Sequence, residues 1–283
     1  MERTMFVSSN KKLKIIRVPI PTPTLWPHTS TNCYLIGNEH ESILLDAGYN
    51  QPETKQGLEN AIAEHKLATP REIVLTHYHP DHAPGVRQLV DWEPTILCHG
   101  KEKQNILDGI APVKEVCAIN DEHELTVAGF KVLAIHTPGH TPGHLTLYIP
   151  SEKVLLAGDN ILGEGTTWIG KPDGDMADYI QTLKRLQKLA IDKLGPGHGD
   201  WVLAPQQQIQ FVLDRRLQRE QQIKELLAHH KKVSTTQLTQ FIYQDNIHPS
   251  VFEVARRTTE AHLIKLVNED IVTQEDSQFS LKV

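Results

Sequence analysis

The most informative segment of the chain reads Thr76-His77-Tyr78-His79-Pro80-Asp81-His82. It follows the apolar run Ile73-Val74-Leu75, which predicts a short buried strand. In extended backbone His77 and His79 point the same way, and Pro80 favours a turn that brings Asp81 and His82 beside them. Such a polar cluster is costly to bury unless it binds a cation or is fully hydrogen-bonded. Nitrogen and oxygen donors without a thiolate favour an open, catalytic metal site.

Three more metal-ligand candidates follow predicted strands or lie in glycine-rich turns. His140 comes after the strand predicted over 132–135, and Asp159 comes after the strand predicted over 154–157. His198 lies in the turn Gly195-Pro196-Gly197-His198-Gly199, where glycine allows the chain to turn sharply. Loops at one edge of a rigid scaffold commonly hold catalytic ligands, so these residues are expected to join the first cluster.

The order of predicted elements indicates two domains. Residues 1 to about 200 alternate short strands with helices, among them a helix over 52–66 and another over 178–190 that Asp178 is expected to cap. After Pro205 the pattern predicts helices to about residue 230, over 235–243 and over 249–268, followed by a hairpin. That order is typical of a winged-helix module. The predicted domains are therefore residues 1–204, which are catalytic, and residues 205–283.

Composition and charge restrict the function. The chain has 283 residues, a net charge of −6 and 16 histidines, so general binding of polyanions is disfavoured and metal or acid–base chemistry is indicated. Three widely spaced cysteines predict no disulfide framework. No apolar run approaches the roughly 20 residues that span a bilayer, and the first ten residues lack a secretory pattern. A cytoplasmic protein without membrane contact is expected.

Taken in order, HxHxDH, GH, GD and a second GH resemble the metallo-β-lactamase superfamily over roughly residues 12–204. Within it, residues 31–35, 158–167 and 196–199 resemble the β-lactamase-like protein 2 group. The resemblance implies an α/β fold, an αββα sandwich with its metal site at one edge of the two sheets. It also implies an all-α winged-helix-like domain after the sandwich. Asp159 stands where many enzymes that open antibiotic β-lactams have a cysteine, which argues against that activity.

The resemblance also assigns roles to seven ligands around two metal ions per chain. The first ion is expected to bind His77, His79 and His140, the second Asp81, His82 and His198, and Asp159 is expected to bridge them. Zn²⁺ is the expected metal, with Mn²⁺ or Fe²⁺ as alternatives because the same donors accept them. Asp81 is also expected to be catalytic, by orienting the nucleophile or passing a proton to the leaving group. His144 is expected to support the site by hydrogen bonding, and His99 and His136 to be strand-end residues rather than ligands.

Three further residues are candidates for substrate contact. Trp26 and His28 lie in a proline-rich loop, and Trp168 follows the turn over 165–167; packing within a surface loop is the alternative for each.

The expected substrate is a thioester or acyl ester, as in hydroxyacylglutathione hydrolase. An endoribonuclease acting on single-stranded RNA is the alternative enzyme, although residues 205–283 contain ten basic and ten acidic residues and so have no net positive charge. A non-catalytic winged-helix binding protein is the alternative of another class. A homodimer is also considered, with the C-terminal helices as its interface.

Overall fold

The computed structural model describes residues 5–7, 13–23, 28–243 and 248–282. Their contacts form two compact units that alternate along the chain. The first unit comprises Met1–Thr137, Gly143–Gly165 and Ala190–Pro205, and the second comprises Pro138–Pro142, Thr166–Leu189 and Gln206–Val283. The predicted domain boundary after residue 204 stays a prediction.

The first sheet of the first unit has seven strands in the order of the sequence. The strands are β1 (Met5–Val7), β2 (Lys14–Pro21), β3 (Ser30–Gly37), β4 (Ser42–Leu45), β5 (Glu72–Val74), β6 (Thr95–His99) and β7 (Cys117–Ile119). The first four are antiparallel, and β4 to β7 are parallel to one another. Helices α1 (Pro52–His65) and α2 (Lys103–Ile110) connect parallel strands, and two short 3₁₀ segments, Pro84–Gln88 and Val90–Trp92, lie between β5 and β6.

The second sheet has five strands in the order β12-β11-β10-β9-β8. Their bounds are β8 (His123–Val127), β9 (Phe130–His136), β10 (Leu145–Ile149), β11 (Val154–Gly158) and β12 (Lys193–Pro196). The first four of these, β8 to β11, form an antiparallel meander, and β12 is parallel to β11.

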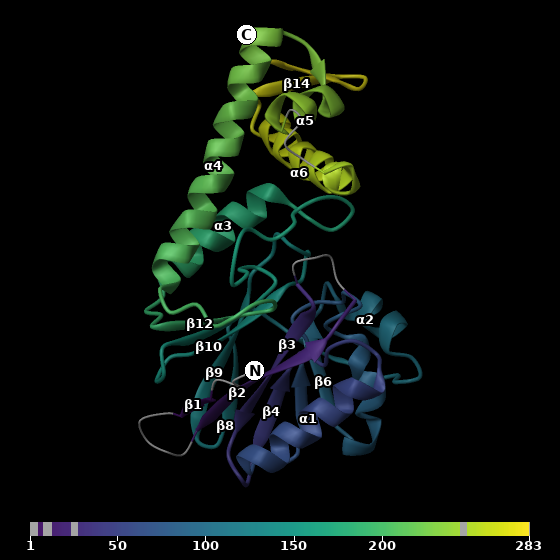
Figure 1. The fold of residues 1–283 in the computed structure, drawn as a ribbon, viewed down its shortest axis with the longest axis vertical. Helices are drawn as coiled ribbons and strands as arrows, with labels where there is room; N and C mark the ends of the chain where they lie inside the picture. Colours follow the sequence, from purple (N-terminus) through teal and green to yellow (C-terminus); the bar gives the residue numbers. More distant parts are fainter. Residues whose placement is uncertain (1–4, 8–12, 24–27, 244–247, 283) are drawn as a thin grey trace. The chain divides into compact units, whose positions relative to one another are not determined.

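Two apolar layers cover the two faces of the first sheet. Side chains alternate along a strand, so Ile15 of β2 packs in the core shared with Leu125 and Leu147 of the second sheet. Its neighbour Ile16 packs in the other core, with Leu58 of α1. Figure 1 shows α1 and α2 on that side of the first sheet. Because both faces are buried, these strands read as continuous apolar runs rather than as an alternating pattern.

The second unit contains four helices and a small sheet. The helices are α3 (Met176–Leu186), α4 (Pro205–His230), α5 (Thr235–Tyr243) and α6 (Pro249–Asn268). Strands β13 (Val233–Ser234), β14 (Val272–Glu275) and β15 (Gln278–Leu281) pair in the order β13-β15-β14. Buried Leu227, Leu238, Leu263 and Phe279 join α4, α5, α6 and β15 in one core, and Figure 1 shows α5 and α6 beside the C-terminal part of the long helix α4.

The start of α3 differs from the prediction. Asp175, not Asp178, caps the helix, and its carboxylate accepts hydrogen bonds from the backbone N–H groups of Ala177 and Asp178 at 2.8 and 2.9 Å. Asp178 lies in the first turn, where a negative charge still interacts favourably with the helix dipole.

Candidate metal centre

The predicted ligands lie where strands of the first unit end, and His140 lies in the loop after β9. The segment from His77 to His82 follows β5, Asp159 follows β11, and His198 follows β12. Because parallel strands end at the same edge of a sheet, the residues after β4 and β5 share one edge of the first sheet, and those after β11 and β12 share one edge of the second. The fold therefore gathers polar residues that are far apart in the sequence.

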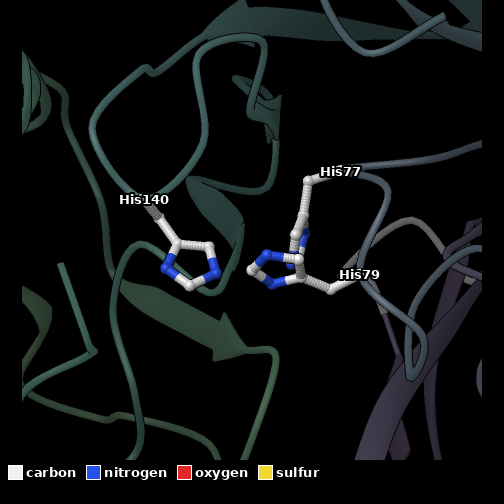
Figure 2. Close-up of side chains that lie close together, drawn as sticks. All are labelled: His77, His79 and His140. Carbon is white, nitrogen blue, oxygen red and sulfur yellow. The ribbon is translucent and has the colours of Figure 1, made fainter. Parts of the chain in front are cut away.

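Among the residues that the structure describes, three groups of side chains could hold a metal ion, each with ligand atoms within 4.8 Å of one another. The groups are His77, His79 and His140; His77, His82 and Asp159; and Asp81, His82 and His198. Together they contain all seven residues that were predicted as ligands. Figure 2 shows the rings of the first group turned toward one another, with His140 facing His77 and His79.

The histidine-rich segment turns as the sequence predicts. The backbone N–H groups of His82 and Ala83 donate to the carbonyl of His79 at 3.0 and 3.2 Å, which closes the turn around Pro80. The ring centroids of His77 and His79 are 4.5 Å apart, and those of His77 and His82 are 4.2 Å apart. A turn of this kind places three imidazoles from six consecutive residues around one point.

Hydrogen bonds at the Nδ1 atoms orient four of the imidazoles. The Nδ1 atom of His140 donates to the carbonyl of Trp168, and that of His198 to the carbonyl of Ser30, both at 2.9 Å. The Nδ1 atom of His82 donates to the Asp46 carboxylate at 2.7 Å. His77 Nδ1 lies 2.9 Å from the hydroxyl of Thr76. Nε2 is then the ring atom with which each can bind a metal, and such outer contacts are the usual support of metal-binding histidines.

Asp46 and Thr76 support the site, although sequence reasoning missed both. Asp46 is buried and accepts hydrogen bonds from the backbone N–H of Thr76 at 2.8 Å, from its hydroxyl at 2.8 Å and from His82. Since the Thr76 hydroxyl gives its one proton to Asp46, it accepts from His77. One carboxylate therefore orients two of the candidate ligands. Asp46 directly follows the strand Ser42–Leu45, as other site residues follow their strands, and this position was the available signal.

Two more supporting contacts come from distant segments. The Thr31 hydroxyl of β3 donates to the Asp81 carboxylate at 2.9 Å. His144 accepts the backbone N–H of Asp159 at its Nε2 atom at 3.2 Å, and its Nδ1 atom lies 2.7 Å from the Asn160 side-chain nitrogen. His144 therefore positions the Asp159 segment, in agreement with the expected supporting role.

The carboxylates of the site stabilise positive charge on two of the imidazoles. Burial works against charge on His198, but the carboxylates of Asp159 and Asp81 raise its pKa to about 10. Burial likewise opposes the charge on His82, yet Asp159, Asp81 and Asp46 raise its pKa well above the usual value. Burial also opposes ionisation of Asp81, but the nearby His82 and His198 lower its pKa to about 2. An environment with these properties also favours a bound cation.

The donor set fits divalent metal ions. Nε2 of His82 lies 3.2 Å from an Asp159 oxygen, and Nε2 of His198 lies 3.2 Å from an Asp81 oxygen and 3.4 Å from Asp159. Imidazole and carboxylate donors this close are the ligands of zinc, manganese and iron sites. Buried carboxylates and imidazoles in such numbers need a cation or protons between them.

Other residues considered at the sequence level have different outcomes. Trp26 lies outside the described residues. His28 stacks on His198, with ring centroids 5.3 Å apart, which places it at the metal-binding groups. The half-buried Trp168 lies close through its backbone carbonyl, which accepts from His140. His99 and His136 stack on each other 4.0 Å apart and are in none of the ligand groups found among the described residues.

Comparison with known proteins assigns the chain to a family. Residues 26–198 match the metallo-beta-lactamase superfamily. The chain belongs to the metallo-β-lactamase superfamily. Residues 234–280 of this superfamily member match the beta-lactamase associated winged helix domain.

Relatives and solved structures agree with this assignment. A beta-lactamase-like protein 2 homolog from Caenorhabditis elegans is 31% identical over 219 residues, covering 76% of this chain and 72% of that protein. An atrochrysone carboxyl ACP thioesterase from Aspergillus fumigatus is 31% identical over 210 residues, which are 74% of this chain and 64% of that protein. A crystal structure of a metallo-beta-lactamase family protein from Thermus thermophilus has a TM-score of 0.78 at 22% identity, with 95% of this chain and 98% of that chain covered.

These findings confirm the predicted sandwich fold with a C-terminal winged-helix domain, and the resemblance to β-lactamase-like protein 2. The predicted class, a metal-dependent hydrolase of this superfamily, is confirmed at the level of the family. Across the described residues, no helix combines the length and the apolar character that crossing a membrane requires. The cytoplasmic location and the homodimer stay predictions.

Proposed function

We propose that this metallo-β-lactamase superfamily member is a hydrolase with two metal ions per chain that cleaves thioesters or related acyl esters. The arrangement of the ligand groups carries the proposal. The group of His77, His79 and His140 shares no residue with the group of Asp81, His82 and His198. The third group links them through His77 and His82 and adds Asp159. Each of the two separate groups would hold one metal ion, and Asp159 would be a further ligand.

The proposed metal is Zn²⁺. Five of the seven side chains are imidazoles and two are carboxylates, a mixture that zinc accepts readily and that leaves coordination positions open for water and substrate. Mn²⁺ and Fe²⁺ accept the same donors with lower affinity, so the metal in the cell also depends on supply.

Bound metal ions would lower the pKa of a water molecule and polarise the carbonyl of the ester. The contribution of the chain is to hold the other groups in place. The Asp81 carboxylate is fixed between the Thr31 hydroxyl and Nε2 of His198, at 2.9 and 3.2 Å. From this position it can accept a proton from the attacking water and deliver it to the leaving sulfur or oxygen.

A thioester substrate is supported by the naming of the Aspergillus fumigatus relative as an ACP thioesterase. The chain spans just under two thirds of that relative's length. A carbonyl substrate is also consistent with the net charge of −6, which does not attract a polyanion.

Charges on the winged-helix domain favour a thioester over RNA. Arg256 and Arg257 of α6 both bind Glu253, at 2.8 and 3.1 Å, and Lys232 binds Glu275 of β14 at 2.5 Å. Phosphate binding needs basic groups that are not already neutralised by carboxylates of the same surface. These ion pairs reduce the positive potential that an RNA-binding winged helix requires.

The test compares the zinc-reconstituted protein on a panel of acyl thioesters and on an unstructured RNA. Asp159→Asn is expected to lose at least about a hundredfold in thioester hydrolysis, because a ligand shared by both metals loses its charge. Asp192→Asn removes a carboxylate that is exposed and paired with Lys153, so its turnover should match the wild type.

Each other outcome overturns part of the proposal. RNA cleavage that Asp159→Asn abolishes, without thioester turnover, would identify a ribonuclease. Metal-loaded protein that turns over neither substrate class but binds a nucleic-acid duplex would identify a winged-helix binding protein instead.

A further inference from the structure

The loop that carries His140 belongs to the second unit and is held by other residues of that unit. The Thr182 hydroxyl of α3 donates to the carbonyl of Pro138 at 2.7 Å, and the backbone N–H of Asp175 donates to the carbonyl of Gly139 at 2.9 Å. Thr182 is buried, so its contact with Pro138 is sheltered from water. The His140 backbone is therefore fixed by a side chain of α3 and by the residue that caps this helix.

Gly139 brings this loop against α3 more closely than any other residue could. A Cβ atom at this position would lie 2.4 Å from the Cα atom of Tyr179, and φ at Gly139 is +135°, where side chains are rarely tolerated. The position of His140 thus depends directly on the position of Tyr179.

Arg216 of α4 contacts both supports of His140. Its guanidinium donates to the backbone carbonyl of Thr167. The carbonyl of the next residue, Trp168, accepts a hydrogen bond from the His140 ring. The same guanidinium lies 5.4 Å from the ring centroid of Tyr179. One side chain therefore fixes both the carbonyl segment that orients the imidazole and the aromatic residue beneath its backbone.

The burial of the charged Arg216 side chain is energetically unfavourable. Only 7% of the residue is exposed, and burying a charged group is unfavourable unless good partners compensate for the lost hydration. It is hydrogen-bonded to the backbone carbonyl of Thr167 and to the side chain of Tyr179, and no carboxylate of the described residues pairs with it, so an ion pair does not account for its presence. Positioning of the 167–168 segment does account for it.

We propose that Arg216 is a positioning residue for the metal ligand His140. The helix that leads into the winged-helix domain then has a role in metal binding that is separate from any contact with substrate. This inference rests on the proposed function in one respect, namely that His140 binds the first metal ion.

The test measures metal binding rather than turnover. Zn²⁺ affinity is determined by competition with a chromophoric chelator, and the visible spectrum of the Co²⁺-loaded protein reports the geometry of the ligands. Arg216→Met is expected to lower the affinity for one of the two metal ions about 10- to 100-fold, as the loss of hydrogen bonds to metal ligands does in other proteins, and to change the Co²⁺ spectrum. Arg216→Lys retains a donor and should lie between Arg216→Met and the wild type.

Arg219→Met is the matched control. Arg219 lies on the same helix, is half-buried, and stacks on Tyr243 at 4.6 Å, but its guanidinium donates to Gln222 and not to the 167–168 segment. The substitution Arg219→Met removes one cation and one arginine–aromatic contact, as Arg216→Met does. It should leave both metal affinities within about threefold of the wild type.

His140→Ala separates failure of this inference from failure of the proposed function. If His140→Ala leaves both metal ions bound as in the wild type, the ligand assignment is wrong. The alternative result is that His140→Ala lowers the affinity for one metal ion. If Arg216→Met then binds both ions with wild-type affinity, or lowers both affinities equally, the positioning role of Arg216 is wrong. Should Arg216→Met not fold, Arg216→Lys decides, because wild-type affinity and spectrum in that variant would overturn the inference.

Discussion

Asp46→Asn tests whether one buried carboxylate controls the histidines that could bind metal. Oδ1 of Asp46 accepts from the backbone N–H of Thr76 at 2.8 Å, and Oδ2 accepts from its hydroxyl and from Nδ1 of His82 at 2.8 and 2.7 Å. Both oxygens therefore face donors. An asparagine has one oxygen and one NH₂ group, so either orientation of the amide places a donor against a donor.

The substitution isolates the charge from the backbone. Asp46 has a φ of 57°, in the left-handed region, which asparagine adopts as easily as aspartate. With the amide oxygen toward Thr76, its NH₂ group faces His82 and favours a ring proton on Nε2, the atom that would bind metal. A hydrogen bond to a charged group contributes about 1.5–3 kcal/mol, which corresponds to about a 10- to 150-fold loss of affinity.

The assay is a Zn²⁺ titration against a competing chelator, which resolves two binding steps. We expect Asp46→Asn to lower the affinity for the ion bound through His82 by about 10- to 150-fold. The affinity for the other ion should change less, because Asp46 is linked to His77 through the Thr76 hydroxyl and not directly. Circular dichroism must match the wild type, and Asp192→Asn serves as the exposed control. If both affinities stayed within about twofold of the wild type, the assigned role of Asp46 would be refuted.

Three further results are expected. Both ring nitrogens of the buried His262 lack a hydrogen-bond partner among the described residues, and burial followed by the charge of Arg216 lowers its pKa well below the usual value. Below about pH 6.5 the unfolded chain then binds a proton that the folded chain does not, so the free energy of unfolding decreases as the pH is lowered, by up to about 1.4 kcal/mol per pH unit. Urea unfolding above and below that pH should show a smaller decrease for His262→Leu than for the wild type, and an equal decrease would contradict this reasoning. Gly139→Ala should destabilise the fold by at least about 2 kcal/mol and reduce metal content, measured by denaturant unfolding and elemental analysis, because the added methyl group overlaps Tyr179. Removing metal with a chelator should lower Tm reversibly, since a ligand of the folded state stabilises it; an unchanged Tm on re-addition of Zn²⁺ would argue against a metal at this site.

The candidate ligands could be found from the sequence because each carries a local signal. His77 to His82 form one continuous motif, His140 and Asp159 each follow a glycine after a short apolar run, and His198 follows a glycine in a glycine-rich turn. The strands themselves were recognisable because both faces of the first sheet are buried, which produces continuous apolar runs such as Ile73-Val74-Leu75. Local chemistry and local periodicity were sufficient for these features.

The helix cap at α3 shows where local signals become ambiguous. Asp175 and Asp178 are both carboxylates near the start of the same apolar pattern, and either can cap a helix. The backbone N–H of Asp175 also donates to the carbonyl of Gly139, a contact between segments 36 residues apart. That distant contact, which no local pattern contains, favours the earlier start.

The order of the motifs and the chemistry of their side chains were thus enough to predict the family, the fold and the residues that could hold metal. The supports of those residues depended on the tertiary structure. Asp46 meets His82, Thr31 meets Asp81 and Arg216 meets Thr167 across separations of 36, 50 and 49 residues. A hydrogen bond depends on distance and direction in space, and only the packing of strands and helices brings such distant segments within its range.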